Sequence, residues 1–263
     1  MPRIASKSVM FITGAFVSHE GWNPWKAYFE SKGYKVYVSP WPQKNGTAAE
    51  QRAKQPNAAL SKVTFADVTN HYAQLAQKIA KENGERPIAI GHSLGGIITQ
   101  QLLSRDLVAA GIAIHSAPPQ GVIPYQLSFL KSGWPALNFF KSIDETYLMS
   151  FEHFQYAFAN GLPLEVQKKA YEENAVPESR RVIRNGLTSM AAVDWKHEHE
   201  PLLFISSPED HFTPASMNKN NQAKYNTKNS IEDYKEFPGK NHYVLGLPNW
   251  HEEADYILGW LGN

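Results

Sequence analysis

The 263-residue chain contains no cysteine, which excludes disulfide bonds, thiolate metal sites and a cysteine nucleophile. It also lacks the long apolar run that a membrane-spanning helix needs, so we expect no stable membrane insertion. Neither sign of charge dominates, since 26 Lys and Arg stand against 25 Asp and Glu. Because the basic residues are scattered along the chain, nothing in the composition indicates a nucleic-acid partner.

The composition is otherwise that of a globular protein, with 42% hydrophobic residues and enough length for one large core plus an inserted lobe. The lack of cysteine fits a reducing compartment, and we expect a cytoplasmic protein. Arg3 and Lys7 before the apolar run 9–17 resemble a secretory signal. Thr13 and Gly14 interrupt that run and no small-residue cleavage pattern follows, so a buried strand is the better prediction.

Short apolar runs typical of strands alternate with helical patterns along the chain. The strand candidates, bounded by Gly, Pro or Ser, lie at residues 8–13, 34–39, 86–91, 111–116 and 201–206, with a weaker run at 230–237. The weaker alternation of the last run suits a strand near a sheet edge. This order predicts an α/β protein with a mostly parallel sheet of about six strands and helices on both faces, hence three layers.

Two stretches carry the apolar periodicity of amphipathic helices. Residues 68–79 place apolar side chains at helical spacing, and Gly84 lies where that helix should end. A second stripe covers residues 250–261, and Asn249 with Glu252 three residues later makes a plausible start for it.

Two regions break the alternation. Residues 40–65 read as a polar excursion before the next helix, and residues 118–200 carry helical patterns rich in aromatics but no convincing strand. Four aromatics of the second region are spaced as on one helix face: Tyr147, Phe151, Phe154 and Phe158. We therefore expect a core of residues 1–117 and 201–263, with 118–200 as a helical cap over the carboxyl edge of the sheet, where open α/β sheets bind ligands.

The segment 91–95, GHSLG, matches G-x-S-x-G between a predicted strand and a predicted helix. A turn this sharp holds Ser93 in a strained conformation and exposes its hydroxyl, and the flanking glycines remove side chains that would collide across the turn. The helix N-terminus offers free N–H groups to a developing oxyanion. The alternative is an uninvolved serine in a glycine-rich turn, and the strand–turn–helix context favours a nucleophile.

A serine nucleophile needs a base to take its proton and an acid to orient that base, in the chain order serine, acid, histidine for this type of turn. Asp210 lies in the loop after strand candidate 201–206, whereas Glu209 is a weaker choice and Asp194 precedes the strand. His242 lies in the loop before the final helix. Asp210 and His242 are thus our candidates for the acid and the base. A solvated turn or helix cap is the alternative role for Asp210.

The other histidines have simpler interpretations. His92 beside the serine suits packing or a hydrogen bond, His115 ends a strand, and His251 lies on the polar side of the last helix. His197 and His199 suggest a metal pair, but no third ligand follows at a suitable spacing, so we expect neither a metal nor a cofactor.

The oxyanion donors should come from the loop after the first strand and from the residue after the nucleophile. Gly14 lets the chain turn tightly there, so the backbone N–H of Ala15 is the first choice and that of Phe16 the second. Leu94 supplies the other donor. Only backbone groups are required, which leaves the side chains free to shape a pocket.

Taken together, these segments resemble the α/β-hydrolase superfamily, in particular its small bacterial serine esterase- and lipase-like members. The resemblance spans nearly the whole chain and rests on TGAFVSHEGWNPW, GHSLGG, PLLFISSPEDHFTP and KNHYVLGLPNW. It implies hydrolysis of a small-molecule carboxylic ester without a cofactor. The chain departs from the family in having Thr13-Gly14 where His-Gly is common, and in lacking the antiparallel strands that often open the fold.

We therefore predict a serine hydrolase whose acyl-enzyme forms on Ser93, with an apolar acyl or alcohol group in the substrate. Candidate pocket residues are the aromatics of the cap, Phe129, Trp134, Phe139, Phe154 and Phe158. An aromatic residue of this kind is more often part of the core than of a pocket. The same triad could run a thioesterase, carbon–carbon hydrolase, hydroxynitrile lyase or perhydrolase reaction, or the chain could be a non-catalytic ligand-binding member of the superfamily.

Overall fold

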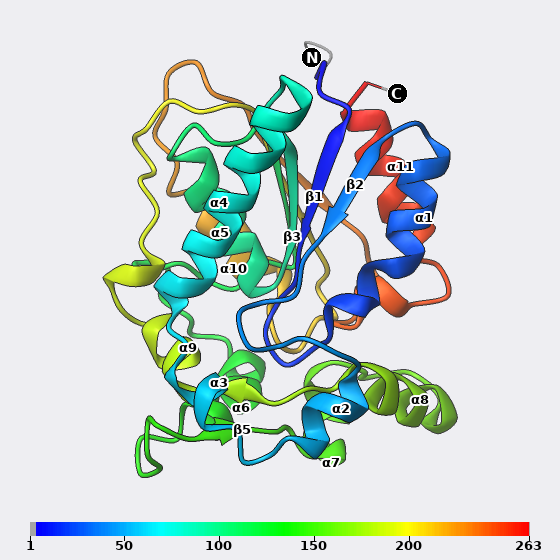
Figure 1. Ribbon diagram of the computed structural model, residues 1–263, viewed down its shortest axis with the longest axis vertical. Helices are drawn as coiled ribbons and strands as arrows, with labels where there is room; N and C mark the ends of the chain where they lie inside the picture. The colour runs from blue at the N-terminus through cyan, green and yellow to red at the C-terminus, as the bar shows by residue number, and fades with distance from the viewer. Residues whose placement is uncertain (1–3, 263) are drawn as a thin grey trace.

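The computed structural model describes residues 4–262, and at its centre lies a parallel sheet in the order β2-β1-β3-β4-β7-β8 (Figure 1). Every neighbouring pair in this sheet is parallel. The strands are β1 (Ser8–Ile12), β2 (Lys35–Val38), β3 (Ile88–His92), β4 (Ala110–Ile114), β7 (Leu202–Ser206) and β8 (Glu232–Glu236). The predicted six-stranded parallel sheet is confirmed, with β8 at an edge.

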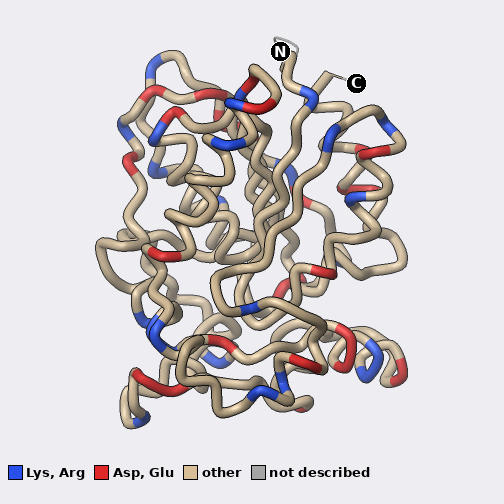
Figure 2. Tube along the Cα trace, viewed as in Figure 1, with Lys and Arg blue, Asp and Glu red and all other residues tan. Residues whose placement is uncertain are grey.

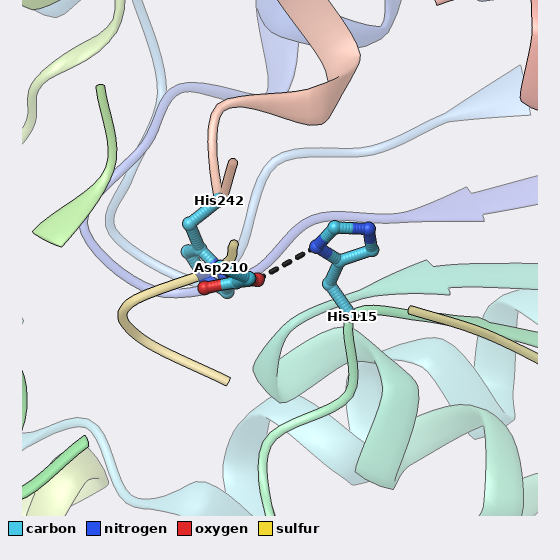
Figure 3. Close-up of side chains that lie close together, drawn as sticks. All are labelled: His115, Asp210 and His242. Atoms are coloured by element: carbon cyan, nitrogen blue, oxygen red, sulfur yellow. Dashed lines mark hydrogen bonds and ion pairs between the residues drawn. The ribbon is translucent and has the colours of Figure 1, made fainter. Parts of the chain in front are cut away.

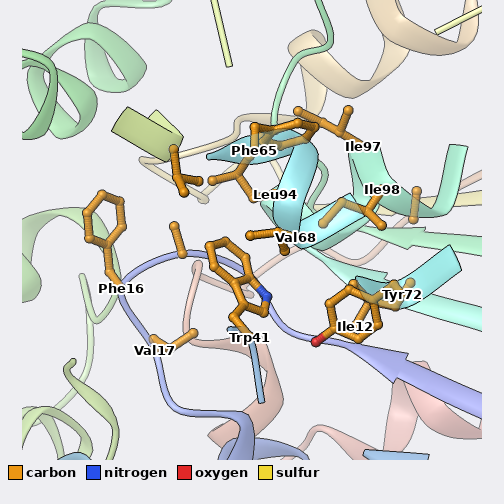
Figure 4. Close-up of a cluster of buried hydrophobic side chains, with 14 of the residues drawn as sticks. Ile12, Phe16, Val17, Trp41, Phe65, Val68, Tyr72, Leu94, Ile97 and Ile98 are labelled. Atoms are coloured by element: carbon orange, nitrogen blue, oxygen red, sulfur yellow. The ribbon is translucent and has the colours of Figure 1, made fainter. Parts of the chain in front are cut away.

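Side chains alternate between the two faces of the sheet, so each inner strand serves two cores. Val9 and Phe11 of β1 pack on one face, under α1 (Asn23–Ser31) and α11 (His251–Trp260). Met10 and Ile12 of β1 join the other core. That face is covered by α4 (Phe65–Asn83), α5 (Leu94–Leu103) and α10 (Ala215–Gln222), as Figure 1 shows, and side chains of α4 and α5 gather near Ile12 in Figure 4. The chain is therefore a three-layer α/β protein.

The predicted helix over residues 68–79 is confirmed as part of α4. Thr64 caps its N-terminus in a reciprocal capping box with Asp67, and Gly84 closes it in the left-handed conformation at φ 73°. The last helix starts at His251, after Trp250, rather than directly after Asn249. Asn249 still contacts the carboxylate of Glu252 at 3.4 Å.

The stretch 40–65, predicted as a polar excursion, contains two short helices, α2 (Ala48–Ala53) and α3 (Ala58–Lys62). Thr47 caps the first of them in a box with Glu50, and Asn57 caps the second. Each of these helices is too short to show a helical period, so the sequence pattern does not predict them.

Residues 118–185 lie beyond the carboxyl ends of the sheet strands, whereas residues 192–200 run back along the side of the molecule to the start of β7 (Figure 1). The helices there are α6 (Leu127–Leu137), α7 (Phe151–Ala157), α8 (Leu164–Asn174) and α9 (Arg180–Asn185). Contrary to the prediction, the region also contains two short antiparallel strands, β5 (Thr146–Tyr147) and β6 (Glu178–Ser179). The predicted stripe from Tyr147 to Phe158 is not one helix face, because Ser150 caps α7 and leaves Tyr147 in β5. In the described part of the chain, residues 4–262, three 3-10 helices complete the fold: η1 (His19–Trp22), η2 (Ser189–Ala191) and η3 (Val244–Gly246).

The loop after β1 is joined to this region by the backbone. Val17 forms an isolated antiparallel bridge with Ala175, the Val176 N–H donates to the Phe16 carbonyl at 2.9 Å, and the Ser18 N–H donates to the Asn174 carbonyl at 2.8 Å. The two segments are more than 150 residues apart in sequence, yet they pair like a short piece of sheet.

Acidic and basic residues are interspersed over the chain trace (Figure 2), as the near-neutral composition implies. Among residues 4–262, the structure contains no helix with the length and apolar character needed to cross a membrane.

Candidate active site

Ser93 occupies the single position between β3 and α5, with φ 57° and ψ −119°. Positive φ is uncommon for a residue with a side chain, so the surroundings must hold this turn. A Cβ on Gly91 would lie 2.1 Å from the Gly95 carbonyl oxygen, and a Cβ on Gly95 would lie 2.2 Å from that of Ile12. Both positions therefore require glycine, and the sequence GHSLG folds as the sharp strand-to-helix turn that it predicts.

Ser93, His242 and Asp210 meet at the carboxyl edge of the sheet. His242 Nε2 lies 3.0 Å from Ser93 Oγ, and His242 Nδ1 lies 2.7 Å from Asp210 Oδ2. The three residues are at most 4% exposed. Because an ionised carboxylate only accepts hydrogen bonds, Nδ1 carries the ring proton and Nε2 is left to accept from the serine hydroxyl. This is the proton-transfer geometry that a serine nucleophile needs.

Asp210 is held by its own loop. Its Oδ1 accepts from the N–H groups of Phe212 and Thr213, at 2.7 and 2.8 Å, and the Thr213 hydroxyl lies 2.9 Å from Oδ2. Burial would raise the pKa of Asp210, but the nearby His242 charge and the hydrogen bond from His115 outweigh it and hold that pKa well below its usual range. Asp210 is therefore an ionised carboxylate with fixed direction.

His115, predicted only as the end of a strand, is a direct partner of this carboxylate (Figure 3). It follows β4 with φ 47°, is fully buried, and places Nδ1 2.6 Å from Asp210 Oδ2. The strand-ending position was the available signal, since β4 lies beside β7 and its carboxyl end meets the loop that carries Asp210.

His92 packs under the ring of His242, with ring centroids 4.7 Å apart. Its Nε2 lies 3.0 Å from the His242 carbonyl oxygen. Since a carbonyl accepts, Nε2 bears the proton. Burial, with the charges of His242 and His115, lowers the pKa of His92 well below its usual value. His92 is thus a neutral hydrogen-bonding residue that supports the backbone of His242, in line with the role expected for it.

The loop after β1 packs directly on the serine turn. A Cβ on Gly14 would lie 2.7 Å from the Ser93 Cβ, so only glycine allows this approach. Where the family often has His-Gly, the Thr13 carbonyl accepts from the Trp41 indole N–H at 3.0 Å, which braces the loop instead. Within residues 4–262, no oxygen accepts from the Ala15 N–H. The Leu94 N–H occupies the first position of α5, where no preceding carbonyl serves it.

Phe16, the second choice as an oxyanion donor, does not have a free N–H. It donates to Glu178 Oε2 at 3.3 Å, and the same oxygen lies 2.7 Å from Lys44 Nζ. Lys44 and Glu178 are 3% and 0% exposed, so this ion pair is buried. Phe16 has a left-handed backbone conformation, at φ 68°, and its N–H points to Glu178 in β6.

An apolar cavity opens beside Ser93. Its walls come from the sheet edge, from residues 118–200 and from the Asp210 loop, and they include Ala15, Leu94, Ile97, Phe129, Ile183, Leu187 and Phe212. The sequence prediction considered only aromatics of residues 118–200, so it missed Phe212, which lies outside that range, and the aliphatic Ile183 and Leu187.

The five aromatics proposed for the pocket have different places. Phe129 lines the cavity. Trp134 and Phe139 are 56% and 57% exposed and contact one another, because Trp134 lies on the outer face of α6. Phe154 is fully buried and stacks on Phe158, whose ring packs against His242 at 4.7 Å. The structure thus brings Phe129 to the cavity and Phe158 to the base, but not the other three.

Histidine and acidic residues gather once among residues 4–262 in a form that could suggest a metal site: His115, Asp210 and His242. Both histidines place Nδ1 within hydrogen-bond distance of the same carboxylate oxygen, so these nitrogens carry protons rather than lone pairs for a metal. His197 and His199 face different carboxylates, Asp106 and Glu232.

The model of the alpha/beta hydrolase family matches residues 9–255, so the chain belongs to this family. A search of the curated proteins gave no match. A monoacylglycerol lipase from Paleococcus ferrophilus is similar in structure with a TM-score of 0.66 at 18% identity, over 97% of this chain and 93% of that one. A methylesterase from Arabidopsis gives 0.66 at 14% identity, over 97% and 98%. A variant of tomato methylketone synthase I gives 0.72 at 15%, over 98% of each chain. Identities this low show the shared fold.

Proposed function

We propose that this protein is a serine hydrolase that cleaves small carboxylic esters with an apolar acyl or alcohol group. The observation that carries the proposal is the relay from Ser93 Oγ through His242 to Asp210, with contacts of 3.0 and 2.7 Å, at the wall of an apolar cavity. A binding protein would need the cavity alone.

In the proposed reaction, Ser93 Oγ attacks the ester carbonyl carbon while its proton passes to His242 Nε2. The N–H groups of Ala15 and Leu94 stabilise the oxyanion of the tetrahedral intermediate. The alcohol leaves with the proton from Nε2, and an acyl-enzyme remains on Ser93. Water then attacks the acyl carbon, gives its proton to His242 and releases the acid. Asp210 keeps the imidazole in the required tautomer throughout.

Residues 118–200 act in this proposal as a cap on the core formed by residues 1–117 and 201–263. Support comes from the cavity, whose wall combines Ser93 and Ile97 of the core with Phe129 and Ile183 of the cap. The apolar lining favours hydrocarbon groups over charged ones. A cytoplasmic location belongs to the same proposal and is supported by the absence of cysteine.

The direct test is Ser93→Ala, measured with short-chain p-nitrophenyl esters. We expect activity to fall by at least about 10³-fold, because the nucleophile is lost, with little change in Tm. The matched control is Ser104→Ala at the other end of α5, whose hydroxyl donates to the Gln100 carbonyl and should leave activity intact. Full activity in Ser93→Ala would refute the proposal.

Two further measurements separate the rival functions. A fluorophosphonate probe should label Ser93, whereas a non-catalytic binder would stay unlabelled. Product analysis with esters, thioesters, β-diketones and cyanohydrins then distinguishes ester hydrolysis from thioesterase, carbon–carbon hydrolase and lyase reactions of the same triad. Oxidation of halide in the presence of peroxide would reveal a perhydrolase.

A further inference from the structure

We propose that His115 is a positioning residue that stays doubly protonated, with Glu253 as its counter-anion, and holds Asp210 ionised and directed at His242. This inference rests on the proposed function, because it concerns the acid of the proposed triad. It extends the relay behind Asp210 by two buried groups.

The first support is the geometry at Asp210 (Figure 3). Its Oδ2 lies 2.6 Å from Nδ1 of His115 and 2.7 Å from Nδ1 of His242. Both rings must donate, since the carboxylate only accepts. His115 therefore fixes the direction of the oxygen that His242 uses.

The second support is the other ring nitrogen. His115 Nε2 lies 3.6 Å from Glu253 Oε1, on α11, and both side chains are fully buried. Neither carboxylate oxygen of Glu253 has a hydrogen-bond partner among the described residues. Burying a carboxylate without a counter-charge is strongly unfavourable. A proton on Nε2 makes His115 a cation between two buried carboxylates and removes that penalty.

The charged groups around His115 also favour a doubly protonated ring. Asp210 faces it from the loop after β7 and Glu253 from α11, while the rings of His242 and neutral His92 complete its ionisable surroundings. Burial alone would lower the pKa of His115. The hydrogen bond that His115 donates to Asp210, together with the close negative charges of Asp210 and Glu253, outweighs burial and raises this pKa to about 9.

The backbone holds the ring in place. His115 has φ 47°, its N–H donates to the Ile205 carbonyl at 2.7 Å, and its carbonyl accepts from the Thr213 hydroxyl at 2.9 Å. Histidine and asparagine tolerate this left-handed region better than most residues. Asparagine is therefore the substitution that keeps the backbone and an N–H donor near Nδ1 but removes the charge.

A cation at this position has a consequence for catalysis. It offsets part of the negative charge of Asp210 as seen from His242, so the base stays unprotonated, and active, to lower pH. Removing the cation leaves two buried anions near the base and should move the acid limb of the kcat/KM profile, which reports protonation of the free enzyme's base, to higher pH.

The experiment compares the wild-type enzyme with His115→Asn, His115→Asn/Glu253→Gln and the surface control His197→Asn. We expect kcat of His115→Asn to fall by about tenfold, with its acid limb about one pH unit higher. KM should stay within about twofold because residue 115 does not line the cavity. The double variant should lie between wild type and His115→Asn in both kcat and the position of the acid limb. His197→Asn should match wild type in both. An unmoved acid limb in His115→Asn would overturn the inference.

A second measurement needs no activity. In wild-type protein labelled with 15N-histidine at neutral pH, both ring nitrogens of His115 should carry a proton, seen as two one-bond N–H couplings. Glu253→Gln assigns the resonance if His115→Asn does not fold. An unprotonated Nε2 would refute the inference whatever the enzyme does. Absence of both esterase activity and fluorophosphonate labelling, with Nε2 protonated, would refute the proposed function alone.

Discussion

The sheet edge around Ser93 and the segment 118–200 above it differ in how they place polar and apolar groups. At the sheet edge, polar side chains such as Asp210 are buried, and hydrogen bonds fix them. In the segment, large apolar side chains are exposed: Phe140 is 95% exposed and Leu127 81%. At the sheet edge, Ser93 and its neighbours are thus positioned by close backbone contacts that admit no larger side chain. In the segment 118–200, the packing depends on side-chain size, and the side chains there can vary.

The strongest test of this difference is to make the same glycine-to-alanine substitution in both regions. Gly95→Ala would place a Cβ 2.2 Å from the Ile12 carbonyl oxygen, and we expect it to lower the free energy of unfolding by about 4 kcal/mol. Gly133 in α6 has nothing within 4 Å of the same position. Gly133→Ala should be neutral or stabilise by up to about 1 kcal/mol, because alanine favours helix. Urea unfolding measures both, and equal losses would contradict the contrast.

A second prediction concerns a buried ion pair between the loop after β2 and the segment 118–200, Lys44 with Glu178. Glu178→Gln should lower the free energy of unfolding by about 3 kcal/mol, because it leaves Lys44 as a buried, unpaired cation. Lys44→Met/Glu178→Gln should recover most of that loss. Urea titrations of the three proteins test this, and a double variant no more stable than the single one would show that the charge is not the cause.

The smallest effect is expected within the cavity. Ile183→Phe narrows the cavity that Ser93 and Ile183 line. It should reduce kcat/KM for the longest accepted p-nitrophenyl ester by about tenfold, with little change for p-nitrophenyl acetate. Trp134→Ala is the control, since Trp134 is 56% exposed on the outer face of α6. A chain-length profile that shifts in the control instead would place the substrate outside this cavity.

Much of the fold could be predicted because its signals are local. The inner strands are uninterrupted apolar runs, and α4 carries its own cap residues, so both stand out in the sequence. The two-residue strands β5 and β6 have no such signal, since they exist only through their pairing with each other. The single helix face predicted from Tyr147 to Phe158 was wrong because helical spacing alone does not show where a helix begins. Ser150 caps the N-terminus of α7 and so leaves Tyr147 outside the helix.

The residues of the candidate site also differ in whether the sequence alone predicts them. Ser93, Asp210 and His242 follow from a motif and from loop positions after strands, and the structure brings their side chains together. His115 could not be found that way, because its importance depends on β4 lying beside β7. Glu253 depends on how α11 packs. The direction of the Phe16 N–H depends on Glu178, a residue 162 positions away.

The pairing of Val17 with Ala175 limits how this enzyme could admit its substrate. Backbone hydrogen bonds tie the loop that carries the Ala15 N–H to the segment between α8 and β6, so moving that segment away from the core would also move the proposed oxyanion donor Ala15 away from Ser93. Elsewhere at the cavity wall, Leu187 is 51% exposed, and its segment has no backbone hydrogen bond to the loop after β1 among residues 4–262. If the proposed reaction occurs here, a cap movement near Leu187 would admit substrate while Ala15 stays beside Ser93.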